Sequence, residues 1–139
     1  MEEATILIVE DDADILEVLS LYVQNAGHRT VKAKTIDEAK IQFTAHTIDL
    51  MLVDVNLPDG SGIDFARDVR RQSEVLIFFV SANDTVEDKL MGFDVGADDY
   101  ITKPFIPKEV IARINAHLGR NKGMKKQRLQ VNDIMIDFE

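Results

Sequence analysis

The chain has 139 residues, of which 45% are hydrophobic and 29% are charged, enough for one domain with a buried core. It contains no cysteine, which excludes disulfide bonds and thiolate metal sites. No apolar run approaches the roughly 20 residues that cross a membrane, and the acidic first segment lacks the basic region of a signal peptide. We therefore expect a cytoplasmic protein without a membrane partner.

Charge divides the chain into two unequal parts. Residues 1–120 carry 12 Lys and Arg against 22 Asp and Glu, whereas residues 121–139 carry 4 and 3. Nonspecific binding of nucleic acid requires cationic side chains against phosphates. The acidic part is therefore not expected to contact DNA itself.

Short apolar runs bounded by turn residues predict five buried strands, at residues 5–9, 28–33, 50–55, 75–80 and 99–102. Helical periodicity predicts a helix after each strand: the first ends before Gly27, the second is capped by Thr35 with Glu38 in a capping box, and the others span residues 63–72, 84–95 and 107–119. Such alternation produces parallel βαβ units with right-handed crossovers. The sequence thus predicts a flavodoxin-like, doubly wound α/β sheet with strand order 2-1-3-4-5 and helices on both faces.

The first and the last of these helices each have an apolar face that is expected to pack on the sheet. The face of the first helix comprises Ile15, Val18, Leu19, Tyr22, Val23 and Ala26. The face of the last helix comprises Ile106, Val110, Ile114 and Leu118.

Polar side chains that could bind ligands or take part in a reaction occupy the carboxyl ends of the predicted strands. Glu10 and Asp11 follow the first strand, Asp54 lies near the end of the third, Ser81 follows the fourth and Lys103 the fifth. Parallel strands bring these ends to one edge of the sheet. Clustered carboxylates repel one another unless a cation compensates them, and an all-oxygen ligand set favours Mg²⁺.

Asp54 is the candidate reactive group at this edge. A single aspartate at a strand end is most often a cap or turn residue, and it is the polar side chains at all four strand ends together that indicate a reactive site. Lys103 can pair with Asp54 or with a phosphoryl oxygen, and Ser81 can donate a hydrogen bond to an incoming anion. An ionised aspartate beside Mg²⁺ can act as a nucleophile and form an aspartyl phosphate. The residues alone therefore support phosphorylation of Asp54.

Four segments in this order and spacing, ILIVEDD, LMLVDVNLPDGSG, FFVSAND and GADDYITKPF, resemble the motifs of a receiver domain of a two-component response regulator. The resemblance covers residues 4–120. It implies that Asp54 is the phosphoacceptor, that Asp11 ligates Mg²⁺ directly and Glu10 through water, and that the main-chain carbonyl of Asn56 is a further ligand. It also implies that Lys103 pairs with the phosphoryl group.

The resemblance further implies a cis bond between Lys103 and Pro104 and a switch formed by Ser81 and Tyr100. In that switch the hydroxyl moves to the phosphate and the aromatic ring turns inward. Glu10 and Ser81 stand where the family more often has Asp and Thr, and both substitutions leave the mechanism possible.

Charges near the last strand are similar to the dimer face of OmpR/PhoB-like regulators. By this resemblance three ion pairs would form across a two-fold axis: Lys89–Glu109, Asp99–Arg113 and Asp98–Arg120. The implied partners are a sensor histidine kinase, which donates the phosphoryl group, and a second copy of the chain.

The domain organisation follows from the same resemblance. Residues 1–120 form the receiver, and the polar, basic segment Asn121–Arg128 reads as a linker. The weakly alternating segment Leu129–Glu139 is similar to the first strand of a winged-helix effector domain. We therefore expect residues 121–139 to begin a truncated DNA-binding domain, through which the whole protein contacts promoter DNA.

Two alternatives remain open on the sequence. A stand-alone receiver would act through protein contacts alone. A phosphohydrolase of the haloacid-dehalogenase type would also use a strand-end aspartate, but it requires a second aspartate two residues later, where this chain has Asn56. Nucleotide binding of the Rossmann type is disfavoured because no GxGxxG motif follows the first strand.

Overall fold

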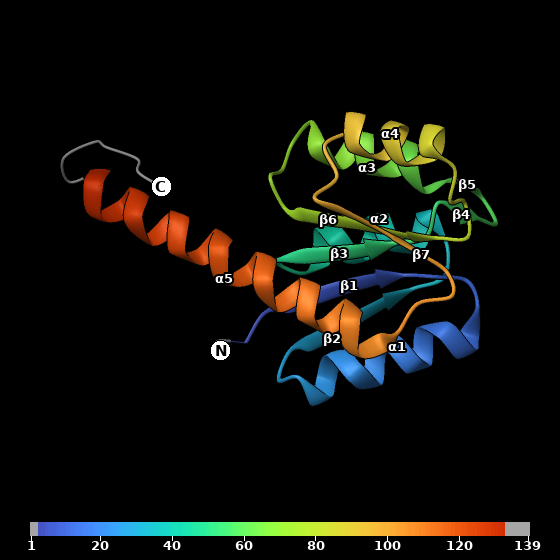
Figure 1. Cartoon of the computed structure of the whole chain (residues 1–139), viewed down its shortest axis with the longest axis horizontal. Helices are drawn as coiled ribbons and strands as arrows, with labels where there is room; N and C mark the ends of the chain where they lie inside the picture. Colours follow the sequence, from blue (N-terminus) through green and yellow to red (C-terminus); the bar gives the residue numbers. More distant parts are fainter. Residues whose placement is uncertain (1–2, 133–139) are drawn as a thin grey trace.

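The computed structural model describes the backbone of residues 3–132 and the side chains of residues 3–119. Parallel strands form a sheet in the order β2-β1-β3-β6-β7 (Figure 1). These strands are β1 (Thr5–Val9), β2 (Arg29–Ala33), β3 (Leu50–Val53), β6 (Leu76–Ser81) and β7 (Asp99–Thr102). The predicted flavodoxin-like sheet and its strand order 2-1-3-4-5 are confirmed, and the strand bounds differ from the predicted ones by two residues or fewer.

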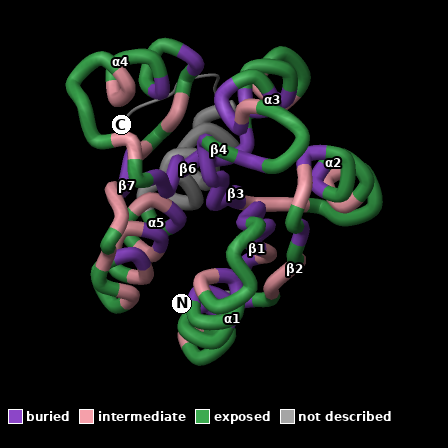
Figure 2. The backbone as a smooth tube through the Cα atoms, turned by 90° about the vertical axis from the view of Figure 1, so that its right-hand side faces the viewer, coloured by how far each residue is buried: buried purple, intermediate pink, exposed green. Residues whose placement is uncertain are grey.

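Helices cover both faces of the sheet, as Figure 2 shows in a view along the strands. The helices are α1 (Ala13–Asn25), α2 (Ile36–Ala45), α3 (Gly62–Arg70), α4 (Val86–Asp94) and α5 (Pro107–Asn132). Leu50 and Leu52 of β3 pack with α1 and α5, whereas Met51 and Val53 pack with α2 and α3. The continuous apolar run of this strand therefore reflects burial on both faces.

The inward face of α1 is rotated from its predicted position. Leu19 and Val23 are buried as predicted, but the prediction is wrong for Val18 and Tyr22, which are exposed, and Leu16 is buried in their place. Both sets of residues satisfy a helical period because apolar residues surround much of this helix. Periodicity alone therefore leaves its rotation undetermined.

The last helix differs from its prediction at both ends. Ile106 was expected to face inward, but it is 64% exposed because it precedes the first helical residue, Pro107, and so lies outside the helical period. The predicted end at Gly119 is also wrong, since α5 continues to Asn132. A glycine inside a helix costs only about 1 kcal/mol, and the Lys, Met, Gln and Arg residues that follow are good helix formers.

The extended α5 includes residues 121–128, predicted as a linker, and the first four residues of the predicted strand 129–139. Those four residues are helical, so the strand prediction is wrong for them, and residues 133–139 lie outside the described part of the chain. Among residues 3–132 every helix is too short or too polar to cross a lipid bilayer.

A short antiparallel hairpin, β4 (Asn56–Leu57) with β5 (Gly60–Ser61), occupies the segment that was predicted as a plain loop. Its turn residue Asp59 accepts hydrogen bonds from the backbone N–H groups of Ile36 at 2.8 Å and Asp37 at 3.1 Å. Asp59 therefore acts as a second cap of α2, beside the predicted cap Thr35, whose hydroxyl accepts from the Glu38 N–H.

The capping contact of Asp59 predicts a pH-dependent contribution to stability. The hydrogen bond from the Ile36 N–H lowers the pKa of the Asp59 carboxyl in the folded state. Its stabilising effect is therefore complete above the ordinary pKa and disappears as the pH falls through the lower folded-state pKa. We expect Asp59→Ala to lower the melting temperature at neutral pH and to lower it less in acid. An equal difference at both pH values would contradict this assignment.

Candidate functional site

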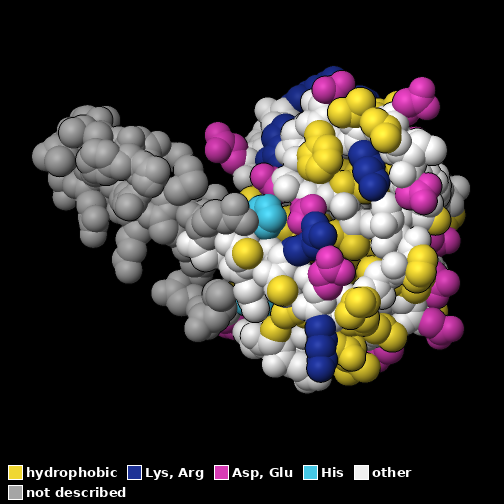
Figure 3. Space-filling view, viewed as in Figure 1, with side chains coloured by type: hydrophobic (Ala, Val, Ile, Leu, Met, Phe, Trp, Pro, Cys, Tyr) yellow, Lys and Arg dark blue, Asp and Glu magenta, His cyan; other side chains and the backbone are white. Residues whose placement is uncertain are grey.

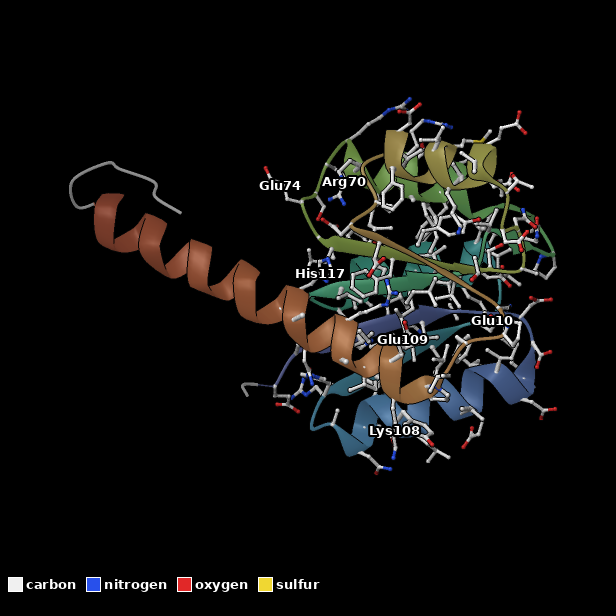
Figure 4. All side chains as sticks on the ribbon, viewed as in Figure 1. Glu10, Arg70, Glu74, Lys108, Glu109 and His117 are labelled. Carbon is white, nitrogen blue, oxygen red and sulfur yellow. The ribbon has the colours of Figure 1, made fainter. Side chains whose placement is uncertain are left out.

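The strand order and register place the predicted site residues next to one another, just beyond the ends of their strands. β1 and β3 are neighbours, with Val9 opposite Val53, so Glu10 and Asp54 are the next residues of adjacent strands. β6 and β7 end level with each other at Ser81 and Thr102, and Lys103 follows. In Figure 4, Glu10 lies at the end of the sheet toward which the strands point. We call this end the carboxyl edge.

The Lys103 ammonium joins two carboxylates at the carboxyl edge. Its Nζ lies 2.9 Å from Glu10 Oε1 and 3.0 Å from Asp54 Oδ2. The other oxygens accept backbone hydrogen bonds, Glu10 Oε2 from the Asp12 N–H and Asp54 Oδ1 from the Asn56 N–H, both at 3.1 Å. Since Glu10 is 2% exposed and Asp54 is 6% exposed, both charges would be costly without this cation.

The protonation of this group follows from burial and pairing. Burial raises the pKa of Glu10 and the charge of Asp54 adds to the effect, against opposing hydrogen bonds from Lys103 and the Asp12 N–H. Burial alone would lower the pKa of Lys103, but hydrogen bonds to Glu10 and Asp54 outweigh it, so its pKa is raised. Lys103 is therefore a fixed positive charge at neutral pH.

Asp11 adds a third carboxylate on the solvent side. One oxygen each from Glu10, Asp11 and Asp54 lie within 4.8 Å of one another, and Asp11 is exposed. Hard carboxylate oxygens at this spacing fit a hard divalent cation such as Mg²⁺, which takes few carboxylates and keeps several waters. The exposure of Asp11 leaves the cluster accessible to such an ion from solvent.

Gly62 allows the segment that carries Asp54 to lie against the start of α3. A Cβ atom at residue 62 would collide with the main-chain oxygen of Asp54 and would lie 2.9 Å from Val53 Cγ1. The Gly62 N–H donates to the Val55 carbonyl at 2.7 Å. Sequence reasoning used this glycine only as a loop signal, because the close approach is a tertiary feature.

The predicted switch residues meet at the backbone of Asn83. Ser81 is buried, and its Oγ accepts from the Asn83 N–H at 3.1 Å. The Tyr100 hydroxyl donates to the Asn83 carbonyl at 2.7 Å, and its ring is 7% exposed. The Asn83 amide oxygen also accepts from Asn56 Nδ2 at 3.1 Å, which links the switch residues to the loop after Asp54. Sequence reasoning identified Asn83 only as part of a strand end.

Three of the predicted dimer-face charges pair within one chain. Arg113 lies 2.9 Å from Asp99 Oδ1 and 3.0 Å from Glu109 Oε2. Lys89 forms no ion pair with any side chain among residues 3–119. Whether these residues pair across a two-fold axis remains a prediction.

Asp98 is also engaged inside the chain. Its Oδ2 accepts from the Ile77 N–H at 2.9 Å and lies 3.4 Å from Arg70 Nη2. The same Arg70 guanidinium donates to the Gly96 carbonyl at 2.8 Å. Arg70 was missed because its partners lie in distant loops, and the side chain of Arg120, the predicted partner of Asp98, lies outside the described side chains.

The cis peptide bond between Lys103 and Pro104 is confirmed.

Residues 6–115 match the family described as the response regulator receiver domain. The chain belongs to this family. The phosphohydrolase alternative is thereby disfavoured.

Similar proteins agree with this membership. The chain is 42% identical over 127 residues to the transcriptional regulatory protein YvrH of Bacillus subtilis, covering 91% of this chain and 54% of that protein. It is 42% identical over 118 residues to the phosphate regulon transcriptional regulatory protein PhoB of Escherichia coli, covering 83% and 52%. The predicted OmpR/PhoB-like subfamily is confirmed, and the chain spans about half the length of these relatives.

Solved receiver structures share the fold. The receiver domain of Francisella response regulator 1452 superposes with a TM-score of 0.81 at 29% identity, covering 85% of this chain and 98% of that one.

The packing of Gly62 generates a prediction about stability. Gly62→Ala would push the start of α3 away from the Asp54 carbonyl, and such overpacking typically costs about 1–3 kcal/mol. We expect urea denaturation to show a loss of this size. An unchanged unfolding midpoint would contradict the described approach of α3 to Asp54.

Proposed function

We propose that Asp54 accepts a phosphoryl group and that the receiver domain thereby switches a regulator of transcription. The observation that carries the proposal is the Lys103 ammonium, held 2.9 Å from Glu10 and 3.0 Å from Asp54. This cation pairs with the nearly buried Asp54 carboxylate and stands where the oxygens of a phosphoryl group on Asp54 would need a partner.

The proposed donor is a phosphohistidine of a sensor histidine kinase. A carboxylate oxygen of Asp54 attacks the phosphorus atom, a P–O bond forms while the P–N bond breaks, and the electron pair returns to the imidazole. Attack by water on the same phosphorus later releases inorganic phosphate and regenerates Asp54. The receiver therefore contributes only its own phosphorylation and dephosphorylation, and it turns over no other substrate.

Magnesium is the proposed cofactor. Asp11 and Asp54 would bind the ion directly and Glu10 would bind it through water. The main-chain carbonyl of Asn56 would be the remaining protein ligand. The bound ion would neutralise charge on the phosphoryl oxygens. The oxygen cluster of three carboxylates supports this assignment. Lys103 would then exchange a carboxylate partner for the phosphoryl group.

The switch is proposed to run through Ser81 and Tyr100. The Ser81 hydroxyl can rotate from the Asn83 N–H toward the phosphoryl group, and this new bond is a differential contact of the kind that a two-state switch requires. The buried Tyr100 ring, bonded to the Asn83 carbonyl at 2.7 Å, represents its inward position. Phosphorylation and the inward ring would therefore favour the same arrangement of the loop at Asn83.

The proposed output is a two-fold dimer through α4, β7 and α5. Figure 3 shows this face, with apolar side chains gathered over α4. Val86, Leu90 and Phe93 are exposed at a spacing of four and three residues, which places them on one side of α4. An exposed apolar patch of this kind is typical of an interaction surface.

We infer that the receiver works in the cytoplasm, as residues 1–120 of a longer regulator, with residues 121–139 leading to a DNA-binding effector domain. The relatives support this: two are transcriptional regulatory proteins about twice as long as the matched part. Promoter DNA would be contacted by the effector domain and not by the acidic receiver.

Replacement of the acceptor tests the phosphorylation site. Asp54→Ala should abolish labelling of the chain by acetyl phosphate with Mg²⁺, because it removes the carboxylate that is proposed to attack the phosphorus atom. Asp64→Ala is the matched control, since Asp64 is exposed and its ion pair among residues 3–119 is with Arg67 at 2.7 Å. Labelling that persists in Asp54→Ala would defeat the assignment, and turnover of a small phosphate ester would restore the phosphohydrolase alternative.

Replacement of Arg113 tests the dimer face. Truncating a central interface charge commonly costs about 1–2 kcal/mol, so Arg113→Ala should weaken the phosphorylation-dependent dimer about 5- to 30-fold in sedimentation equilibrium. Arg71→Ala removes an exposed arginine at the C-cap of α3 and should leave dimerisation unchanged. Equal dimer affinity in the Arg113 variant and the wild type would exclude this face.

A further inference from the structure

Helix α4 is held on the sheet through very little buried surface. Within α4, which the structure describes throughout, Gly92 is the one buried residue. Leu90, Met91 and Phe93 around it are exposed. Val95, the C-cap residue that follows α4, is also buried in the core. The docking of the helix itself therefore depends largely on what Gly92 touches.

Gly92 lies against two aromatic rings. A Cβ atom at this position would come within 3.0 Å of Tyr100 Cδ2, 3.1 Å of Phe79 Cδ2 and 3.2 Å of Tyr100 Cε2. These distances are shorter than the ordinary van der Waals separation of carbon atoms, about 3.5–4.0 Å. Because Gly92 has no side chain, the two rings can approach this side of α4 closely, and a methyl group there would crowd them. We call this space at Gly92 the slot.

Backbone geometry does not explain this glycine. Gly27, Gly60 and Gly96 have positive φ angles and Gly92 does not, so an alanine could adopt its helical conformation. Glycine in a helix interior is also less favourable to helix stability than alanine. The close approach of the Tyr100 ring is the feature of the structure that an alanine would disturb.

The ring in the slot is fixed on three sides. The Tyr100 ring is tilted against Phe79 with ring centroids 6.1 Å apart, and its hydroxyl donates to the Asn83 carbonyl at 2.7 Å. Gly92 closes the third side. Consistent with this enclosure, burial raises the pKa of the Tyr100 phenol.

We propose that Gly92 is the positioning residue that admits the Tyr100 ring to its inward position, so that α4 docks on the sheet through the switch tyrosine itself. Outward movement of the ring would remove the surface on which α4 rests. The exposed stripe of Val86, Leu90 and Phe93 would then move with α4. The inference rests on the proposed function only in treating Tyr100 as the switch residue; the slot itself is independent of phosphorylation.

The tyrosine content of the chain allows a direct test. The sequence has two tyrosines and no tryptophan, so in a Tyr22→Phe background the tyrosine fluorescence comes from Tyr100 alone. We expect Gly92→Ala in this background to increase quenching by acrylamide and to shift the phenol titration toward the ordinary pKa of tyrosine. Hydrogen exchange of the α4 amides should also become faster.

Gly119→Ala is the matched control, because it is a helical glycine whose added Cβ would meet no atom within 4 Å. It should change neither the quenching nor the exchange of α4. A Tyr100 that remains equally shielded in Gly92→Ala, with unchanged α4 exchange, would overturn the proposal.

A double-mutant cycle separates the slot from a general effect on folding. Removing the ring in Tyr100→Thr relieves most of the crowding, so Gly92→Ala should be more favourable to stability in this background than in the wild type. Equal effects in both backgrounds would overturn the proposal. If instead Gly92→Ala exposes Tyr100 but leaves phosphorylation-dependent dimerisation intact, the slot is supported and the proposed output role of Tyr100 fails.

Discussion

The structure depends on one cation placed between two nearly buried carboxylates. Lys103 lies about equally far from Glu10 and Asp54, at 2.9 and 3.0 Å. Removing two carboxylates from water is costly, and a cation at hydrogen-bonding distance from both is what makes their burial tolerable. The contact exists because three separate strands end at the same edge, which in turn follows from the parallel order of the sheet. The chemistry of the site is therefore a property of the whole topology and not of any local motif.

The same edge provides a physical route from Asp54 to the surface of α4. Hydrogen bonds connect the loop after Asp54 to Asn83, and Asn83 to both Ser81 and Tyr100. The Tyr100 ring then contacts Gly92 of α4. Each link is a contact of the described structure, so a change of charge at Asp54 has a continuous set of packed groups through which it can bias the position of α4.

Much of the fold was predictable because its signals are local. Alternating apolar runs and helical periods specify the parallel sheet, and the polar residues at the strand ends specify the site once the sheet is known. The rotation of α1 was not predictable, because Val18 and Leu16 both satisfy a helical period. The cap that Asp59 provides for α2, the contacts of Arg70 with Asp98, and the close approaches at Gly62 and Gly92 all join segments distant in sequence. Such contacts leave no periodic signal, and they become visible only in the folded chain.

Locating the acyl phosphate in the chain tests most directly whether Asp54 is the residue that accepts the phosphoryl group. Reduction of a phosphorylated aspartate with borohydride converts it to homoserine, which mass spectrometry of the digested chain can locate. After reaction with acetyl phosphate and Mg²⁺, we expect homoserine at residue 54. Homoserine at another aspartate, such as Asp11 or Asp59, with residue 54 unmodified, would contradict it.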